Sequence, residues 1–204
     1  LKSIDRTQAI AALSDCVFKI ACDVTNPLLG PNGASAVYGP QKGATPEMVQ
    51  FLDGALDNFA KVTKEYMNND FSEYPGAGAA GGLGYAFVTF LGARLKRGVD
   101  MVLDAIGFDK MIEGADLVIT GEGRIDAQTL TGKTPYGVLQ RASRQGIPVM
   151  VLAGLVDLDD SSGFTAIRQI TPPDMRLSEA MLPAVASANL RRTISALLQQ
   201  IRIT

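Results

Sequence analysis

Four charged side chains stand among small residues in the segment DLVITGEGRIDAQTLTGKT, residues 116–134. Glu122 and Asp126 are hard oxygen donors, which can hold Mg²⁺ directly or through water. Lys133 beside Gly132 suits a phosphate group, through its charge and the neighbouring backbone amides. An equally simple interpretation pairs both acids with Arg124 or Lys133 in a solvated connection. The residue types alone leave these two alternatives open.

The same segment nearly contains two known nucleotide-binding signatures. Residues 121–126, GEGRID, would be a dinucleotide fingerprint if Asp126 were glycine. Residues 127–134, AQTLTGKT, would be a phosphate-binding loop if Ala127 were glycine. Because neither pattern is complete, both classes of site are disfavoured.

The elements that must position these side chains form a βαβ pattern. The apolar run at residues 117–119 predicts a buried strand, and Thr134-Pro135 predicts a helix start, with a polar loop at 121–133 between them. Ligands of parallel α/β sheets bind beyond the carboxyl ends of the strands, where this loop would lie. A helix at 135–145, strands at 148–153 and 167–170, and a helix at 178–201 are expected to follow. Three strands make a thin sheet, so we expect a missing amino-terminal segment or a partner chain to complete it.

A second group of candidate residues lies upstream. Residues 16–22 predict a strand, followed by a long stretch rich in glycine, proline and asparagine that holds Asp23, Asn26, Gln41 and Lys42. Long irregular connections in compact domains are usually functional, although Asp23 and Asn26 could instead be local turn formers. Thr45-Pro46 then predicts a helix start, with apolar spacing that continues to about residue 66.

A glycine-rich segment, PGAGAAGGLG at residues 75–84, precedes a helix expected at 85–95. Gly76, Gly78 and Gly81 match the dinucleotide pattern, but Tyr74-Pro75 stands where a buried strand is required, so a nucleotide site of that type is improbable. Residues without a Cβ let backbone amides approach an anion closely. The alternative is close packing of helices through small residues.

Composition excludes several classes of function. The formal net charge of -2 and an aromatic content of 6% disfavour nucleic acid as a partner. The chain contains no histidine, which removes histidine-dependent nucleophiles and metal sites and favours phosphoryl transfer by elimination. Two cysteines make disulfide or zinc chemistry improbable. Neither a membrane span nor a secretory leader is expected, so we predict a cytoplasmic protein.

Four spaced motifs resemble the bacterial type I glycerate kinase family: ACDVTNPLLGPNGAS, YGPQKGATPE, PGAGAAGGLG and DLVITGEGRIDAQTLTGK. The resemblance is strong from residue 21 to about 154. It implies a fragment of an α/β enzyme, with a Rossmann-like (flavodoxin-like) parallel-sheet half-domain at residues 114–204. Residues 1–113 would be part of a second, inserted α/β domain that carries the glycine-rich binding loops.

The same resemblance implies ATP-dependent phosphorylation of glycerate, usually to 2-phosphoglycerate, with Mg²⁺ and in a cleft between the two domains. The expected catalytic residues are Asp23, Asp126 and Lys133, and Glu122 is the expected metal ligand. Residues expected to bind substrate or phosphate are Asn26, Gln41, Lys42, Gly76, Gly78, Gly81, Gly82, Gly121, Gly123 and Arg124. The alternative hypothesis is a non-catalytic anion-binding or assembly module derived from such a kinase.

Overall fold

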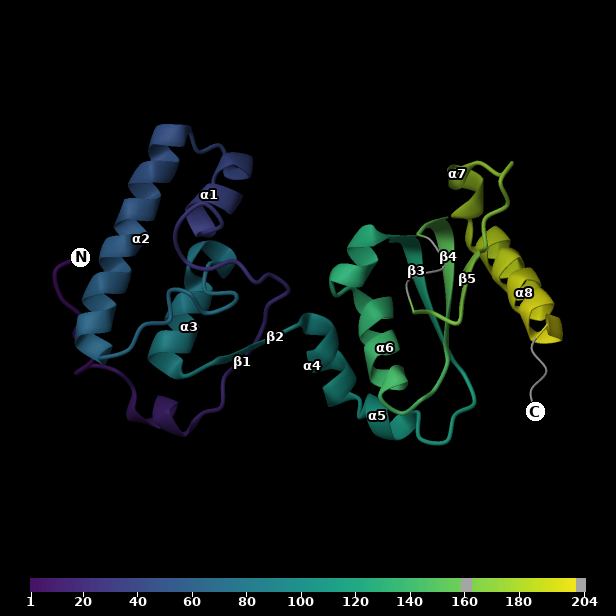
Figure 1. Cartoon of the computed structure of the whole chain (residues 1–204), viewed down its shortest axis with the longest axis horizontal. Helices are drawn as coiled ribbons and strands as arrows, with labels where there is room; N and C mark the ends of the chain where they lie inside the picture. Colours follow the sequence, from purple (N-terminus) through teal and green to yellow (C-terminus); the bar gives the residue numbers. More distant parts are fainter. Residues whose placement is uncertain (159–162, 201–204) are drawn as a thin grey trace. The chain divides into compact units, whose positions relative to one another are not determined.

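The computed structural model describes residues 1–158 and 163–200, which form two compact units (Figure 1). The first unit comprises residues 1–98, and the second begins at Val99. The sequence motifs predict a domain boundary between residues 113 and 114. In the structure, Leu103 and Ile112 already belong to the core of the second unit.

The first unit contains a long helix, two shorter helices and a two-stranded parallel sheet. Its strands, β1 (Lys19–Ala21) and β2 (Arg94–Lys96), pair in parallel with Lys19 opposite Arg94. The helices are α1 (Ala34–Tyr38), α2 (Pro46–Met67) and α3 (Leu83–Leu91), with short 3₁₀ turns at Ala11–Asp15, Pro40–Lys42 and Ala79–Gly81. Leu28, Ala60, Ala77 and Tyr85 form its buried core.

Helix α2 begins where the sequence predicted. The Thr45 hydroxyl accepts the Met48 N–H at 3.3 Å, and Pro46 occupies the first turn, where no N–H is required. Asn68 adopts a left-handed conformation, with φ of 52°, and ends the helix. The capping signals in the sequence therefore determined both the place and the type of this element.

Two expected helices in this unit are wrong in extent. The helix expected at 85–95 ends at Leu91, because Gly92 adopts the left-handed conformation and the next residues pair with β1 as strand β2. The weakly amphipathic pattern of residues 3–13 also predicts a helix, but the structure has only the 3₁₀ turn Ala11–Asp15 there. Its apolar pattern is weak, and no residue of that turn is buried to stabilise a longer helix.

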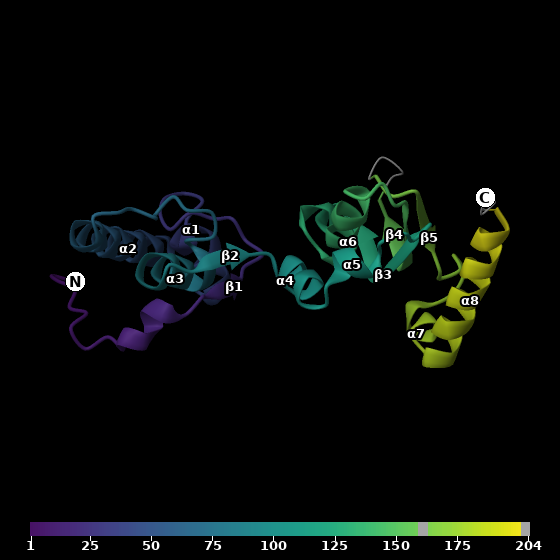
Figure 2. The ribbon, with the colours of Figure 1, turned by 90° about the horizontal axis from the view of Figure 1, so that it is seen from below.

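The second unit is a three-stranded parallel sheet with helices, which confirms the α/β class. Strands β3 (Val118–Asp126), β4 (Val149–Asp157) and β5 (Ala166–Gln169) lie in that order. Its helices are α4 (Gly98–Ala105), α5 (Phe108–Met111), α6 (Thr134–Ser143), α7 (Leu177–Ala180) and α8 (Pro183–Gln200), with a 3₁₀ turn at Ala127–Thr131. Helix α6 lies beside β3 and β4 in both ribbon views, and its Val138, Leu139 and Ala142 join the core (Figures 1 and 2).

Strand β3 is longer than expected, and the polar loop predicted at 121–133 is therefore wrong over residues 121–126. The ladder with β4 continues through Glu122 opposite Ala153 to Asp126 opposite Asp157. A Cβ on Gly154 would lie 2.6 Å from the Gly123 carbonyl oxygen, so the two backbones approach closely where both strands carry glycine. Glycines that suggested a loop in the sequence allow close strand packing instead.

Arg141 joins α6 to the preceding helices. Its side chain is 9% exposed and contacts three carboxylates: Asp104, Asp109 at 2.6 Å, and Asp100 at 3.5 Å. The pKa of Arg141 is raised, chiefly by its hydrogen bond to Asp104. A buried guanidinium requires several such partners to offset its lost hydration.

Tyr85 makes the first unit sensitive to alkaline pH. The side chain is fully buried, and burial raises the pKa of its phenol above the ordinary value of 10.0. The stability that this group contributes is complete below about pH 10, where the unfolded chain would ionise, and is lost as pH rises through the raised pKa. Urea denaturation at pH 9 and 10.5 should show a smaller loss of unfolding free energy for Tyr85→Phe than for the unchanged chain. Tyr66→Phe, at an exposed site, is the control, and equal losses in all three proteins would contradict the prediction.

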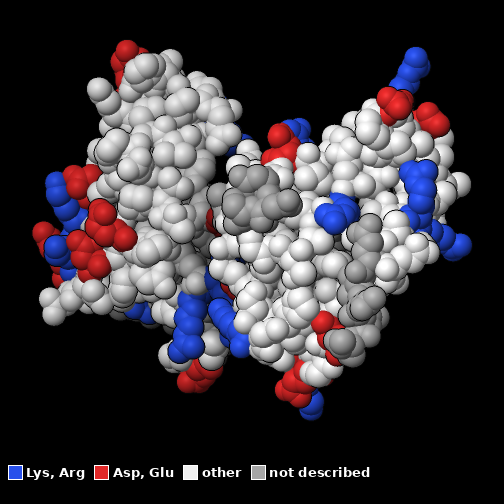
Figure 3. Space-filling view, turned by 45° about the vertical axis from the view of Figure 1, so that its right-hand side comes forward, with Lys and Arg blue, Asp and Glu red and all other residues white. Residues whose placement is uncertain are grey.

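No helix within the described ranges 1–158 and 163–200 is long and apolar enough to cross a bilayer. Acidic and basic side chains are interspersed on the face shown in Figure 3.

Candidate active site

The charged residues of the central segment lie at the carboxyl ends of two neighbouring strands. Glu122, Arg124 and Asp126 are alternate residues in the second half of β3, and Asp126 is its last residue. Asp157 ends β4 and lies opposite Asp126 in the parallel register. This is the edge at which parallel α/β sheets place their ligands.

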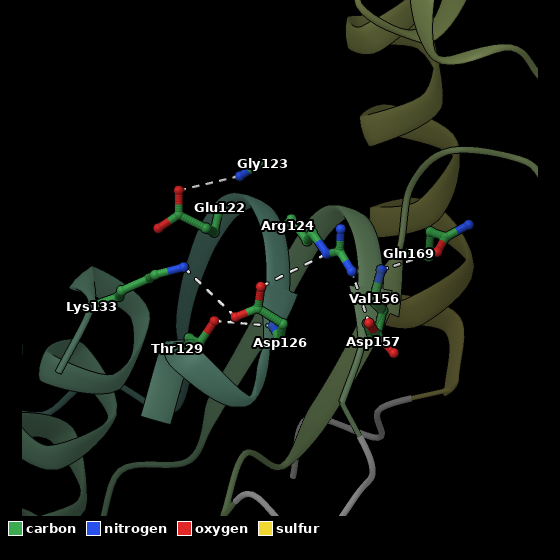
Figure 4. A network of polar contacts seen from close by, with 9 residues as sticks. All are labelled: Glu122, Gly123, Arg124, Asp126, Thr129, Lys133, Val156, Asp157 and Gln169. Atoms are coloured by element: carbon green, nitrogen blue, oxygen red, sulfur yellow. Dashed lines mark hydrogen bonds and ion pairs between the residues drawn. The ribbon is translucent and has the colours of Figure 1, made fainter. Parts of the chain in front are cut away.

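A chain of ion pairs connects these side chains (Figure 4). Arg124 donates to Asp157 at 2.8 Å, and its Nε lies 3.7 Å from Asp126 Oδ2. Lys133 Nζ lies 3.6 Å from Asp126 Oδ1. Such exposed pairs stabilise a fold by only about 0–1 kcal/mol, so stability does not account for gathering four charges here.

Local structure fixes the two central residues. Asp126 is the N-cap of the 3₁₀ turn Ala127–Thr131, and its backbone N–H donates to the hydroxyl of the fully buried Thr129 at 3.1 Å. Lys133 is the N-cap of α6, and Pro135, in the first turn of the helix, is buried. A turn anchored by Thr129 therefore brings the carboxylate and the ammonium group to the same place.

Asp126 has an unusual feature for a carboxylate. Among the described residues, its Oδ1 is buried and has no hydrogen-bond partner, and Lys133 Nζ lies beyond hydrogen-bond distance. Buried acceptors in native proteins are nearly always satisfied, so an exception calls for a function. This oxygen can accept a proton or a hydroxyl hydrogen bond from a bound molecule.

Glu122 lies apart from the chain of ion pairs in Figure 4. Its carboxylate accepts the N–H of the adjacent Gly123 at 3.3 Å. In the part of the chain that the structure describes, no three acidic or cysteine side chains gather closely enough to hold a metal ion. Magnesium in phosphate-transfer sites needs only one or two carboxylates, with water and phosphate oxygens as its other ligands, so Glu122 fits that role as a single ligand.

Asp157 is a residue of the candidate site that sequence reasoning missed. It closes the apolar run of β4 in the way that Asp126 closes β3. A polar residue at the end of each neighbouring parallel strand is the signal that could have identified it. The β4 end is held further by Gln169, whose side-chain oxygen accepts the Val156 N–H at 3.0 Å.

The upstream polar candidates have structural partners in the first unit. Asp23 is exposed, and its Oδ1 accepts the Gly98 N–H at 2.8 Å. Asn26 is half-buried and accepts the Tyr38 hydroxyl at 2.7 Å while donating to the Asn32 carbonyl at 2.9 Å. Asn26 therefore bonds within its own loop, whereas Asp23 accepts the amide of a residue distant in the sequence, and a binding role for either residue stays a prediction.

The glycine-rich segment packs closely against the loop that contains Asn26. A Cβ on Gly78 would lie 2.3 Å from the Pro27 carbonyl oxygen, and one on Gly76 would lie 2.8 Å from a Leu95 methyl carbon. Gly82 adopts φ of 101° against Leu28. Gly81 differs, because an added Cβ there would meet nothing within 4 Å. Close packing therefore explains Gly76 and Gly78, whereas their anion-binding role stays a prediction.

Gln41 and Lys42, with Gly81, line a cavity of about 590 Å³ in the first unit. Most of the rest of its wall comes from α1 and α2 and is mainly apolar. The predicted residues thus form two groups. Arg124, Asp126 and Lys133 lie together in the second unit, and Gln41, Lys42 and Gly81 lie together in the first.

Paired cations and carboxylates at the carboxyl edge of a parallel α/β sheet define a class of site suited to binding anionic groups. Residues 1–202 match the model of the glycerate kinase family, and the chain belongs to that family.

Named relatives agree with this assignment. The chain is 46% identical to the glycerate kinase of Bacillus subtilis (strain 168) over 88% of its length, and 42% identical to the glycerate 2-kinase of Escherichia coli (strain K12) over 96%. These alignments cover 48% and 54% of the two relatives, so the chain spans about half their length. A crystal structure from Salmonella typhimurium LT2 named glycerate kinase 2 matches 98% of the chain and 54% of its own, with 43% identity and a TM-score of 0.78.

Proposed function

We propose that the protein containing this chain transfers the γ-phosphoryl group of ATP to a hydroxyl of glycerate, giving 2-phosphoglycerate. Membership of the glycerate kinase family supports the reaction class, and the name of the Escherichia coli relative supports the 2-phosphate. The observation that carries the proposal is the buried, unpartnered Oδ1 of Asp126 beside Lys133.

Asp126 orients the acceptor hydroxyl and takes its proton as the oxygen attacks the γ-phosphorus. The phosphorus forms its new bond to that oxygen as the bond to ADP breaks, and the charge spreads over the transferring oxygens. Lys133 neutralises this charge. Its Nζ lies 3.6 Å from Asp126 Oδ1, so the ammonium group is not held by a short hydrogen bond and can turn toward a phosphate. Arg124 binds either a phosphate oxygen or the glycerate carboxylate.

Glu122 would hold Mg²⁺ together with phosphate oxygens of the nucleotide. The ion, when bound, neutralises phosphate charge and fixes its geometry. Asp126 is less suited to this role, because both of its oxygens face cations. The backbone amides of Gly121 and Gly123 remain proposed contacts to oxyanions.

In the first unit, Lys42 remains a proposed phosphate or carboxylate ligand, and Gly81 is the best placed of the glycines for an anion. Asp23 remains a proposed catalytic residue, although one of its oxygens already holds the Gly98 amide.

Asp157 would position Arg124 without touching the substrate. Asp157→Asn weakens the pair at 2.8 Å and frees the guanidinium to move, so we expect KM for glycerate or ATP to rise about three- to tenfold with a smaller change in kcat. Steady-state kinetics for each substrate would measure this. Asp174→Asn, in the segment after β5, is the control, and unchanged KM values for Asp157→Asn would remove Asp157 from the site.

Calorimetry and a coupled ADP assay together test the proposed function. Titration of the 204-residue chain with ATP, Mg²⁺ and glycerate should show binding, and ADP release should require glycerate in the complete protein. Binding by both proteins without turnover in either would favour the anion-binding module instead.

A further inference from the structure

The cavity of the first unit is poorly suited to glycerate. It has a volume of about 590 Å³ and lies among α1, α2 and the 3₁₀ turn Ala79–Gly81. Leu52, Leu56 and Phe59 of α2 form one wall. Glycerate is a small, highly polar acid, which would leave most of this space empty and its apolar wall uncovered.

A flat heterocycle with an attached sugar suits the same space. Cavities of about 300–1,000 Å³ with apolar walls and a few polar groups are typical of sites for ligands of this size. The Phe59 ring is held by an edge contact with Tyr85, with ring centroids 5.6 Å apart, so this wall is a fixed apolar surface.

The polar end of the cavity carries the charge that a nucleotide requires. Gln41 and Lys42 lie on one 3₁₀ turn, Pro40–Lys42, and both line the cavity. The Lys42 ammonium complements a polyphosphate, and the Gln41 amide can both donate to and accept from a base or a ribose. Tyr38, on the α1 side, is fixed by its 2.7 Å bond to Asn26.

Backbone strain occurs in the same wall. Ala80 lines the cavity with φ of 50° and ψ of 41°, a left-handed conformation that is unfavourable for a residue with a Cβ. Strained residues of this kind are concentrated at ligand sites.

We infer that this cavity takes the adenosine part of the nucleotide, with the phosphates toward Lys42. The inference rests on the proposed function, since only an ATP-dependent reaction supplies this ligand. It assigns base and ribose to an apolar site in the first unit, which the sequence motifs did not indicate.

Adenosine itself is the probe, because it lacks the phosphates that other cationic sites could bind. Calorimetric or ligand-observed NMR titration of the 204-residue chain should show adenosine binding. Ala55 lines the cavity from α2, so Ala55→Leu fills the space while keeping a good helix former. We expect this variant to weaken adenosine binding at least tenfold, about 1.4 kcal/mol. Lys61→Leu, at an exposed site on the same helix outside the cavity wall, should change it less than about twofold.

Lys42→Ala provides the second variant, which keeps the test decisive if Ala55→Leu unfolds. It should weaken ATP binding at least fivefold and leave adenosine binding nearly unchanged, because the ammonium meets only the phosphates. Absent adenosine binding, or equal affinities in a folded Ala55→Leu variant and the unchanged chain, would overturn the inference. So would equal losses of ATP and adenosine binding in Lys42→Ala.

Steady-state kinetics distinguish an error in the adenosine site from an error in the proposed function. If glycerate is phosphorylated and Ala55→Leu leaves KM for ATP unchanged, the function stands and the adenosine site is wrong. If adenosine binds and Ala55→Leu abolishes binding, but glycerate stimulates no ADP release, the site stands and the proposed reaction is wrong.

Discussion

Asp126→Asn and Lys133→Ala should each lower kcat for glycerate phosphorylation by at least about a hundredfold in the complete protein. Asparagine keeps the shape of the side chain but cannot take the hydroxyl proton, which removes the role assigned to the unpartnered Oδ1. Alanine at position 133 removes the cation that lies 3.6 Å from that oxygen and would stabilise the transferring phosphoryl group. A coupled ADP assay at saturating ATP and glycerate would measure both losses.

The matched controls come from an exposed ion pair of the same types. Lys61 contacts Asp57 at 2.6 Å on α2, so Asp57→Asn and Lys61→Ala remove equivalent charges at an exposed pair away from the candidate residues. Both controls should retain nearly full kcat and ordinary folding, as judged by circular dichroism. If the two site variants also kept nearly full kcat, the end of β3 would have no part in the chemistry.

Arg141→Ala should lower the free energy of unfolding by about 2–4 kcal/mol. The substitution leaves Asp100, Asp104 and Asp109 without their shared cation and opens a space between α6 and the preceding helices. The estimate lies below the full penalty for a broken buried pair, because the Asp104 and Asp109 side chains are each about half exposed and remain hydrated. Urea denaturation followed by circular dichroism would measure the change.

Arg144→Ala is the control for this measurement. Arg144 lies three residues later, at the exposed C-cap of α6, and its substitution should change stability by less than about 0.5 kcal/mol. Asp109→Asn should have an intermediate effect, since it weakens only one of the three contacts. A loss in Arg141→Ala no larger than that in Arg144→Ala would show that the guanidinium does not hold these helices together.

Elements with local signals were predictable from the sequence. Thr45 and Pro46 specified the start of α2, and Pro135 with Gly146 bounded α6 to within a few residues. Elements that depend on a distant partner were not. Strand β2 is only three residues long and exists because Arg94 pairs with Lys19, and β3 continues past Gly121 because β4 lies beside it.

The candidate site also contains residues that local sequence signals predict and residues that only a distant strand or helix brings in. Asp126, Lys133 and Arg124 were found because they are close together in the sequence, and the structure places them in one network. Asp157 joins that network only through the register of two strands, which no local pattern displays. The apolar cavity around Gln41 and Lys42 could not be predicted from the sequence either. Much of its wall is one face of α2, whose apolar spacing is the same as that of a helix packed against a protein core.

The pairing of β1 with β2 also affects how the chain is made on the ribosome. Strand β1 is synthesised early, but its partner residues Arg94–Lys96 emerge only after α1, α2 and α3. During that interval the helices can form from local contacts, while the Lys19–Ala21 backbone lacks its sheet hydrogen bonds and is not covered by its partner strand. The first unit therefore completes its fold near the end of its own translation, and β1 is the part most in need of protection from aggregation until then.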